Sequence, residues 1–583
     1  MKNLFNSKIF NEPQKNAIYK ADSMKNNDIL LIQGPPGTGK THTILGLISL
    51  LLKNDMKSKV LVCAPSNAAI DEISARLATK GIYNSQMENT KCKFLRFGLY
   101  DRKDKEKKYL ETLNGKILEK YSLEYLSDQK YKKDLDSLSE KIENLRRQLN
   151  NYNKDKDKNI GYIKNTESEI SICLKLFSDK KYQKSIFEHD ILISSPILCT
   201  TLNNAGNERL KKANLSYEYL IIDEASQCVE PSCLIPLCHE VKKLILVGDH
   251  MQLPATVFYP KATKILYNRS LFERLIDNKY PRYILTVQYR MQPNISKFIS
   301  EVFYDNKLTN DESHIININK EPLYSLIKKE NNFSFFDISY GEEIFEEGKK
   351  SYYNESEIRF CLKLVKKIIT IINDQIFDYE NILKEKNIEQ NNCIDKINNK
   401  INENENENKN ENNIHDNNNT IDPEEKIKIL QNYKFAIICT YKSQVIKFKD
   451  FLKTDKFFKN QKINDIEINT VDSFQGQERD IIIFSTVRAN FKDEAILEDG
   501  EIPSSPEKSN NNKESIGIGF LNDFRRMNVG LSRAKIGCFV VGNFETLKNN
   551  SYWGKLLNYC KDRKSFFSVE KSNELEAIKN ILK

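Results

Sequence analysis

Eight residues near the start of the chain, Gly34 to Thr41, match the pattern G-x-x-x-x-G-K-[ST]. They directly follow an apolar run, Ile29–Ile32, that is typical of a buried strand. Only 20 of the 583 residues are glycine, yet three of them fall within six positions here. A loop of this kind presents backbone N–H groups and the N-terminus of a helix to a chain of phosphates. The pattern therefore predicts a nucleotide-binding loop, although a Gly-Pro turn before a helix is the simpler interpretation.

The residue types within this loop indicate a nucleoside triphosphate with Mg²⁺. The Lys40 ammonium is expected on the β- and γ-phosphates, and the Thr41 hydroxyl is expected on Mg²⁺. Backbone N–H groups around the glycines would bind the remaining phosphate oxygens. The nucleotide-binding residues predicted in the loop are Gly37, Thr38, Gly39, Lys40 and Thr41.

A second apolar run, Tyr219–Ile222, ends in two adjacent carboxylates. Beside a phosphate-binding loop, one carboxylate can hold Mg²⁺ while another orients and deprotonates the attacking water. We assign Asp223 to the metal and Glu224 to the water. A strand that ends in Asp-Glu is commonplace by itself, so this assignment depends on the loop.

Four further polar residues have chemistry that suits the same reaction. Gln252, after the next apolar run, can donate to the γ-phosphate. The Gln14 amide can pair with the N6 and N7 edge of adenine, which favours ATP. Arg290 and Arg533 can supply the positive charge that the transition state of phosphoryl transfer requires. Taken singly, each of the four also fits an ordinary surface turn or ion pair.

Apolar runs without polar alternation recur along two regions of the chain and alternate with helical stretches. This is the pattern of parallel sheets covered by helices on both faces. We therefore predict an α/β fold, with a first domain from residues 1–100 and 190–277 and a second from residues 278–372 and 433–560. The strands predicted in the first region are Ile29–Gln33, Val60–Ala64, Phe94–Phe97, Ile193–Cys199, Tyr219–Ile222 and Leu244–Gly248. Those in the second are Tyr283–Leu285, Phe333–Asp337, Phe435–Thr440, Ile466–Thr470, Ile481–Thr486 and Cys538–Gly542.

Three segments interrupt these domains, and a fourth follows them. Residues 101–189 are highly charged, and apolar residues with heptad spacing predict an antiparallel helical hairpin that turns within residues 150–159. Residues 373–432 are rich in Asn and Glu and predict disorder, as do residues 491–515. Residues 561–583 are expected to form a C-terminal helix or tail. The heptad positions are Leu135, Leu138, Ile142, Leu145 and Leu149.

Composition narrows the class of protein further. Lys and Arg total 90 against 81 Asp and Glu, a mild excess of +9 that permits an anionic partner without requiring one. The N-terminal residues have no apolar segment typical of a secretory signal, and no apolar run is long enough to cross a bilayer, so we expect a soluble intracellular protein without a membrane partner. The 12 cysteines include no C-x-x-C, so we expect neither disulfides nor a metal-thiolate site.

Together these motifs, in this order, resemble those of superfamily 1 helicases. The branch resembled is the one that moves 5′ to 3′ and holds senataxin and the nonsense-mediated-decay helicase, and the senataxin type is the most similar. The resemblance implies two RecA-like P-loop NTPase domains with ATP and Mg²⁺ in the cleft between them. The segments that carry it are Gln14, Gly34–Thr41, Ala64–Ala69, Asp223–Gln227, Gly248–Pro254, Gln288–Met291, Val471–Glu478 and Arg525–Lys535, with Thr200–Gly206, Arg269–Leu275 and Tyr352–Glu357 favouring the senataxin type.

The resemblance also implies roles for residues that pattern alone does not assign. Tyr289 would stack on adenine, and Glu478 would contact the nucleotide from the second domain. The charged hairpin would form a prong over a nucleic-acid channel. The implied partners are single-stranded RNA or DNA and RNA–DNA hybrids, bound by a monomer in the nucleus, with the cytoplasm as the alternative location. Residues implied along the channel are Asn67, Thr200, Thr201, Tyr441, Ser443, Gln444 and Thr470.

The chain departs from the family pattern in one respect that bears on function. Relatives usually carry a small β-barrel and a stalk ahead of the position of Gln14, and only 13 residues precede it here. Either the sequence is a truncated gene model or the chain lacks that wall of the channel. This favours an alternative function: a nucleic-acid-stimulated ATPase that remodels ribonucleoproteins without processive unwinding. A scaffold with relic motifs, and a GTPase or small-molecule kinase with the same loop, are weaker alternatives. The first leaves the intact site residues unexplained, and the second leaves the arginines of the second domain unexplained.

Overall fold

The computed structural model describes residues 9–54, 58–84, 86–99, 111–401, 423–460, 466–489 and 518–583. The chain forms two compact units. The first comprises residues 1–35, 39–250 and 254–285, and the second comprises residues 36–38, 251–253 and 286–583. The phosphate-loop motif and the segment around Gln252 therefore each contribute residues to both units.

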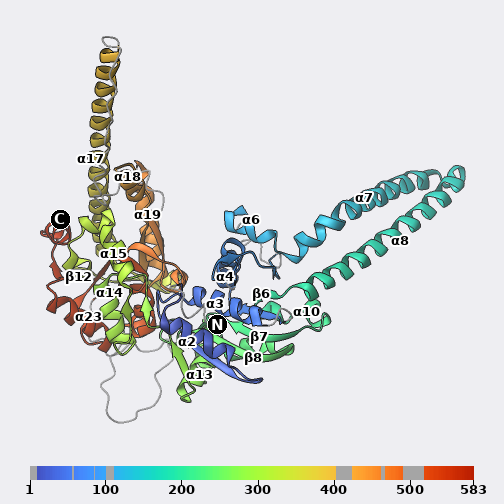
Figure 1. Cartoon of the computed structure of the whole chain (residues 1–583), viewed down its shortest axis with the longest axis horizontal. Coiled ribbons are helices and arrows are strands. Elements are labelled where there is room, and N and C mark those ends of the chain that lie inside the picture. The colour runs from blue at the N-terminus through green and yellow to red at the C-terminus, as the bar shows by residue number, and fades with distance from the viewer. Residues whose placement is uncertain are drawn as a thin grey trace. The chain divides into compact units, whose positions relative to one another are not determined.

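Within the described residues, the first unit contains a seven-stranded sheet in the order β5-β6-β2-β7-β8-β1-β9. Every neighbouring pair in it is parallel. Parallel strands need crossover connections, and helices fill these connections (Figure 1). The strands are β1 Ile29–Gln33, β2 Val60–Ala64, β5 Phe94–Arg96, β6 Ile197–Thr201, β7 Ser216–Ile222, β8 Glu240–Gly248 and β9 Arg282–Ile284.

Apolar side chains of this sheet enter two separate cores, one on each face. Leu30 and Ile32 of β1 lie in one core, and Leu31 lies in the other, because successive side chains of a strand point to opposite faces. The first core includes residues of helices α2 Glu12–Asp22, α3 Lys40–Asn54 and α4 Asn67–Lys80. The second includes residues of α9 Leu202–Ala205, α10 Glu208–Lys212 and α13 Leu271–Asp277.

The second unit repeats this architecture with a six-stranded parallel sheet among its described residues, in the order β16-β15-β17-β18-β12-β19. One face packs against α17 Glu355–Ile401, α19 Lys442–Thr454 and α24 Glu574–Lys579. The other packs against α14 Pro293–Phe303, α21 Phe524–Leu531 and α23 Ser551–Asp562. The strands are β12 Phe333–Ile338, β15 Phe435–Cys439, β16 Ile466–Thr470, β17 Arg479–Ser485, β18 Ala534–Gly542 and β19 Phe566–Val569. The two parallel sheets with helices on both faces confirm the predicted fold class.

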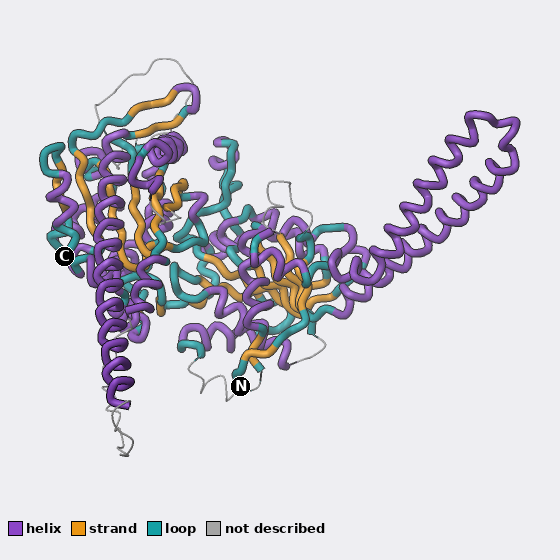
Figure 2. The backbone as a smooth tube through the Cα atoms, turned by 90° about the horizontal axis from the view of Figure 1, so that it is seen from above, coloured by secondary structure: helices purple, strands orange, loops and turns teal. Residues whose placement is uncertain are grey.

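Two long helices of the first unit, α7 Leu123–Tyr152 and α8 Lys156–Ser194, lie side by side (Figures 1 and 2). The short 3-10 helix η2 Asn153–Asp155 joins them. Ile142 and Leu145 of α7 are buried against Cys173 of α8. Across the pair, Lys180 Nζ lies 2.9 Å from Asp134 Oδ2. Apolar contacts and ion pairs therefore both hold the two helices in register.

Four sequence predictions require correction. Tyr283–Leu285 was expected in the second domain, but β9 pairs with β1 in the first sheet. Helix α8 continues to Ser194, so β6 begins at Ile197 rather than at residue 193. Residues 373–401, predicted to be disordered, continue α17, and residues 423–431 form helix α18. Residues 561–583 contain the expected C-terminal helix, α24, but also an unpredicted strand, β19, which pairs in parallel with β12.

The predicted disordered loop at residues 491–515 lies outside the described residues, as do residues 100–110. In the part of the chain that the structure describes, no helix is both long and apolar enough to cross a membrane.

Candidate nucleotide site and nucleic-acid interface

The phosphate-binding loop follows β1 and leads into α3, which begins at Lys40. Gly37 and Gly39 have φ angles of +74° and +79°, in the region that side chains rarely adopt. The Lys40 side chain folds back across Gly34, and its ammonium donates to the Gly34 carbonyl oxygen at 3.2 Å. A Cβ atom on Gly34 would lie 2.1 Å from Lys40 Cγ, so only glycine leaves room for this lysine. The glycines therefore shape the loop and position its cation.

The paired carboxylates lie where β7 ends, and Glu224 faces the loop lysine. Glu224 Oε1 lies 3.5 Å from Lys40 Nζ. Glu224 adopts a left-handed conformation with φ +50°, and its N–H donates to Asp223 Oδ1 at 2.9 Å. The Gln227 amide donates to Glu224 Oε2 at 2.5 Å. Non-glycine residues held in such strained conformations are frequent at functional sites.

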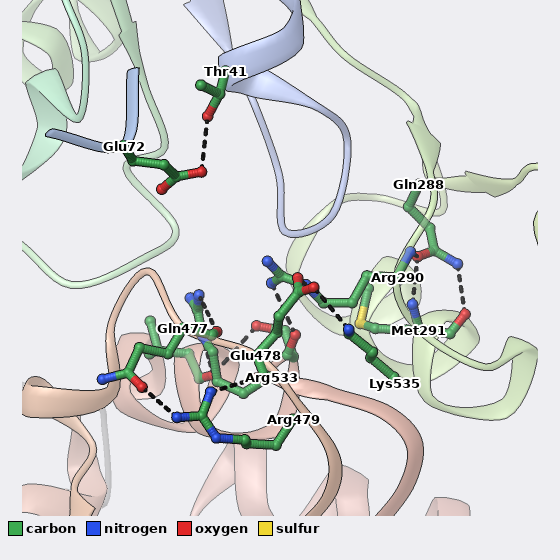
Figure 3. A network of polar contacts seen from close by, with 12 residues as sticks. Thr41, Glu72, Gln288, Arg290, Met291, Gln477, Glu478, Arg479, Arg533 and Lys535 are labelled. Carbon is green, nitrogen blue, oxygen red and sulfur yellow. Dashed lines mark hydrogen bonds and ion pairs between the residues drawn. The ribbon is translucent and has the colours of Figure 1, made fainter. Parts of the chain in front are cut away.

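Asp223 lies in an environment that disfavours its charge. Burial, followed by the neighbouring Glu224, raises the pKa of Asp223 to about 8, while Lys40 acts in the opposite direction. A nearby cation would favour the ionised form. The donor set expected for Mg²⁺, the Asp223 carboxylate and the Thr41 hydroxyl, consists of oxygen atoms, which are the ligands that Mg²⁺ prefers. Thr41 Oγ1 itself donates to Glu72 Oε1 of α4 at 3.5 Å (Figure 3).

Gln14, predicted to recognise adenine, lies beside the same loop. It accepts from the Asn11 N–H at 3.2 Å and its own N–H donates to Asn11 Oδ1 at 3.0 Å, which forms the capping box of α2. A Cβ atom on Gly39 would lie 2.8 Å from Gln14 Nε2. Helix capping thus fixes the Gln14 side chain next to the phosphate-binding loop.

In the second unit, Arg290 and Glu478 form an ion pair. Arg290 Nε donates to Glu478 Oε2 at 2.7 Å, and Lys535 Nζ lies 3.0 Å from Glu478 Oε1 (Figure 3). Burial alone would raise the pKa of Glu478, but the two cations lower it to about 2. Glu478 therefore balances two basic side chains at the edge of the sheet where β17 and β18 begin.

The second predicted arginine, Arg533, contacts Gln252 within the same unit. Arg533 Nη2 donates to Gln252 Oε1 at 2.8 Å, and both side chains are buried. The Asn528 amide donates to the Met251 carbonyl oxygen at 2.7 Å.

Tyr289, the residue predicted to stack on adenine, precedes Arg290 in the sequence. Its N–H donates to the Gly37 carbonyl oxygen at 2.8 Å. Tyr289 is 38% exposed.

Three of the residues predicted along the nucleic-acid channel are 0% exposed, and their side chains bond within the protein. Thr200 Oγ1 donates to the Phe97 carbonyl oxygen at 3.2 Å. Ser443 Oγ donates to Glu346 at 2.7 Å. The Gln444 amide donates to Ser485 Oγ at 2.9 Å and accepts from the Asn354 N–H at 2.8 Å. We therefore revise the prediction for these side chains: they support the loops that surround them.

The four remaining channel residues lie at the ends of buried strands. Asn67 begins α4, just after β2, and accepts from Arg96 Nη2 at 3.0 Å. Thr201 ends β6 and caps α9. Tyr441 follows β15, and Thr470 ends β16, which pairs in parallel with β15. Because parallel strands end at the same edge, Asn67 and Thr201 share one sheet edge, and Tyr441 and Thr470 share another.

Sequence reasoning missed a group of residues that organises the second of these edges. Glu357, near the start of α17, is fully buried and accepts from Ser485 Oγ at 2.6 Å and from the Val487 N–H at 3.0 Å. Glu343 accepts from Arg488 Nε at 2.8 Å. Glu357 lies within a segment that carries the family resemblance, but its partners, Ser485 and Val487, are too distant in the chain for a local pattern to reveal them.

Comparison with known proteins finds matching family models and related helicases. Two family models, each described as an AAA domain, match residues 9–260 and residues 267–388 and 383–545. Helicase SEN1 of Saccharomyces cerevisiae is 32% identical over 95% of this chain and 23% of its own length. This chain belongs to the superfamily 1 helicases of the senataxin and nonsense-transcript-regulator branch.

Two further relatives support membership of this helicase branch. Helicase sen1 of Schizosaccharomyces pombe is 30% identical over 95% of this chain and 30% of its own length. Probable helicase senataxin of Homo sapiens is 29% identical over 98% of this chain and 20% of its own length. The chain thus spans less than a third of the length of these three helicases.

Proposed function

We propose that this chain is an ATP-dependent 5′-to-3′ helicase that moves on single-stranded RNA or DNA and unwinds duplexes or RNA–DNA hybrids. The observation that carries the proposal is the approach of Lys40 Nζ to Glu224 Oε1 at 3.5 Å. It joins the predicted phosphate-binding lysine to the predicted water-activating carboxylate. Membership of the helicase branch supplies the link from ATP hydrolysis to nucleic acid.

In this proposal the first unit holds the triphosphate. Lys40 binds the β- and γ-phosphates, Thr41 and Asp223 hold Mg²⁺, and Gln14 recognises adenine. Bound Mg²⁺ neutralises phosphate charge. Glu224 orients a water molecule opposite the γ-phosphate and accepts its proton, which its contact with Lys40 supports.

The second unit contributes positive charge and the adenine-stacking ring. We assign Arg290 and Arg533 to the transition-state oxygens, where an arginine is worth about 10³- to 10⁵-fold in rate. The hydrogen bond between Arg533 and Gln252 supports a shared role at the γ-phosphate, because Gln252 is the predicted sensor of that group. Tyr289 stacks on adenine, and Glu478 keeps Arg290 oriented through their 2.7 Å ion pair.

The nucleic acid passes along the strand ends where Asn67, Thr201, Tyr441 and Thr470 lie. Polar side chains and backbone groups at these strand ends bind phosphates and sugars, which position a strand without reading its sequence. RNA, DNA and hybrids are therefore all candidate substrates. We propose a nuclear role in transcription termination or RNA metabolism, in line with the senataxin-type resemblance.

A strand-displacement assay tests this function against the remodelling alternative. The substrates are RNA–DNA hybrids with a 5′ or a 3′ single-stranded tail, with Lys40→Ala as the inactive control. ATP-dependent displacement of the 5′-tailed hybrid alone is the expected result. Nucleic-acid-stimulated ATP hydrolysis without displacement would favour the remodelling ATPase. Displacement of only the 3′-tailed hybrid would contradict the proposed direction.

A further inference from the structure

Four aromatic rings form a continuous row in the second unit. Phe345 of strand β13 Ile344–Glu346 lies directly opposite Tyr352 of strand β14 Ser351–Tyr353, with ring centroids 4.9 Å apart. Tyr352 contacts Tyr441 at 5.3 Å, and Tyr441 contacts Phe520 at 5.4 Å. Tyr441 follows β15, so the row lies at the edge where the strands of the second sheet end.

The two ends of this row are exposed, while Tyr441 within it is buried. Phe345 is 49% exposed and Phe520 is 53% exposed, whereas Tyr441 is 5% exposed. A single exposed phenylalanine is ordinary on a protein surface. Here the two exposed phenylalanines are joined by tilted and edge-to-face ring contacts through Tyr352 and Tyr441, so they belong to one connected group of rings.

The backbone around the row is shaped to fit it closely. Gly519 precedes Phe520 with φ +58°, and a Cβ atom there would lie 2.5 Å from the Tyr441 hydroxyl oxygen. Val487, a β-branched residue, has φ +72°. Such a conformation is costly and persists only where surrounding contacts impose it.

Those contacts come from the start of α17. The Val487 N–H donates to Glu357 Oε2 at 3.0 Å, and the Val487 carbonyl oxygen accepts from Asn354 Nδ2 at 3.2 Å. The strained turn presents the next residue, Arg488, to the row. The Arg488 guanidinium lies 4.5 Å from the centroid of the Tyr352 ring. The chain thus holds a strained residue in place in order to position an arginine beside the aromatic row.

A second cation flanks the row, and two carboxylates near it are paired. Arg526 lies 4.9 Å from the Phe520 ring. Glu343 pairs with Arg488, and Glu346 pairs with Lys349 at 2.9 Å. Exposed rings interspersed with cations are the chemistry of surfaces that bind single-stranded nucleic acid by stacking its bases and contacting its phosphates.

We propose that Phe345 and Phe520 are base-stacking residues for single-stranded nucleic acid, placed at either end of the row through Tyr352 and Tyr441. This inference rests on the proposed function and deepens it, because backbone contacts alone do not require bases. Stacking is tolerant of sequence, since every base has a flat face, and therefore suits an enzyme that moves along a strand. Base stacking on Phe345 and Phe520 adds contacts with the bases to the contacts with phosphates and sugars.

The test compares the binding of two oligonucleotides of equal length, one with bases and one with an abasic backbone. Phe345→Ala and Phe520→Ala are compared with Phe377→Ala, a control on α17 that is 59% exposed and stands outside the row. We expect each row variant to bind the base-containing strand roughly 5- to 100-fold more weakly, and to bind the abasic strand as the wild-type chain does. Phe345→Trp and Phe520→Trp should restore tight binding.

Two results would overturn this inference. The first is wild-type affinity of both alanine variants for the base-containing strand, and the second is equal weakening for the abasic strand. Tight binding of both oligonucleotides by the wild-type chain, together with either of these results, would overturn the inference alone and leave nucleic-acid binding by this chain intact. Failure of the wild-type chain to bind either oligonucleotide would contradict the proposed function itself.

Discussion

Arg533 donates from Nη2 to Gln252 Oε1 at 2.8 Å, and fewer than 5% of either side chain is exposed. The two residues are 281 positions apart in the sequence. Sequence analysis assigned them separately, one as a transition-state cation and the other as a γ-phosphate contact. In the proposed reaction, this hydrogen bond should make the effects of the two residues on catalysis interdependent.

Because of this hydrogen bond, we expect the effects of substituting Arg533 and Gln252 on kcat to be non-additive. Arg533→Ala should lower kcat for ATP hydrolysis by about 10³-fold or more, because the variant lacks the cation that neutralises negative charge in the transition state. Gln252→Ala should have a smaller effect, and the double variant should resemble Arg533→Ala. Steady-state ATPase rates check this, with Arg359→Ala as a surface control that keeps wild-type rates. Multiplied effects in the double variant would show that the two residues act independently.

Substitutions of Lys40 and Glu224 should affect ATP binding and ATP hydrolysis differently. Glu224→Gln should keep ATP affinity while kcat falls by about 10²- to 10⁴-fold, because the general base is lost. Lys40→Ala should lower both ATP affinity and kcat. Equilibrium binding of a fluorescent ATP analogue, measured beside turnover, distinguishes the two. Lys212→Ala, an exposed change on α10, serves as the matched control, and wild-type turnover in Lys40→Ala would remove Lys40 from the site.

Glu357 predicts a specific dependence of stability on pH. Burial raises its pKa from 4.5 to about 8, against hydrogen bonds from Ser485, Val487 and Thr486 that lower it. At pH values between these two pKa values, Glu357 holds a proton in the folded chain but has lost it in the unfolded chain. The free energy of unfolding should therefore fall as pH rises through this window, by up to about 1.4 kcal/mol per pH unit, and then level off.

The variant Glu357→Gln removes this titration. Its free energy of unfolding, relative to the wild-type value, should therefore increase from pH 6 to pH 8. Urea unfolding at three pH values across this range provides the measurement. A difference between the two proteins that stays constant with pH would show that Glu357 is already ionised in the folded chain.

The helical pair α7 and α8 should matter for unwinding more than for ATP binding. Residues 135–179 can be replaced by a short Gly-Ser linker between Asp134 and Lys180, whose side chains already meet at 2.9 Å. This cut keeps Leu123 and Leu192, which are buried in the core of the first unit. We expect strand displacement to fall at least about 10-fold while ATP affinity is retained. Lys180→Ala alone is the control, and unchanged displacement by the shortened chain would refute the prong assignment.

Much of the fold was predictable because buried parallel strands are continuous apolar runs. The bounds of β1, β2 and β16 match the predicted segments residue for residue. The sheet to which a strand belongs is harder to predict, because it depends on contacts distant in sequence. Tyr283–Leu285 was therefore placed in the wrong domain. Asn-rich composition also concealed part of α17, although Ile372, Ile376 and Tyr379 have helical spacing and pack against one core.

The residues of the candidate sites also differ in how well the sequence predicts their roles. Short motifs predicted the loop, its lysine and the carboxylate pair, because their chemistry is local in sequence. Polar residues after strand ends were harder to interpret. Gln444 and Ser443 have the residue types of a nucleic-acid contact, but their partners Asn354, Ser485 and Glu346 occupy them inside the protein. A sequence pattern does not separate such a supporting residue from an exposed one.

The proposed reaction depends most on one arrangement, in which Arg290 and Arg533 neutralise charge on a nucleotide held by Lys40. Solving the structure of the protein with Mg²⁺, ADP, aluminium fluoride and a single-stranded oligonucleotide tests it directly. We predict guanidinium nitrogens of both arginines at hydrogen-bond distance, about 3 Å, from the fluoride atoms that mimic the transferred phosphate. Both guanidinium groups turned away from the fluoride, with Lys40 bound to the phosphates alone, would contradict the account.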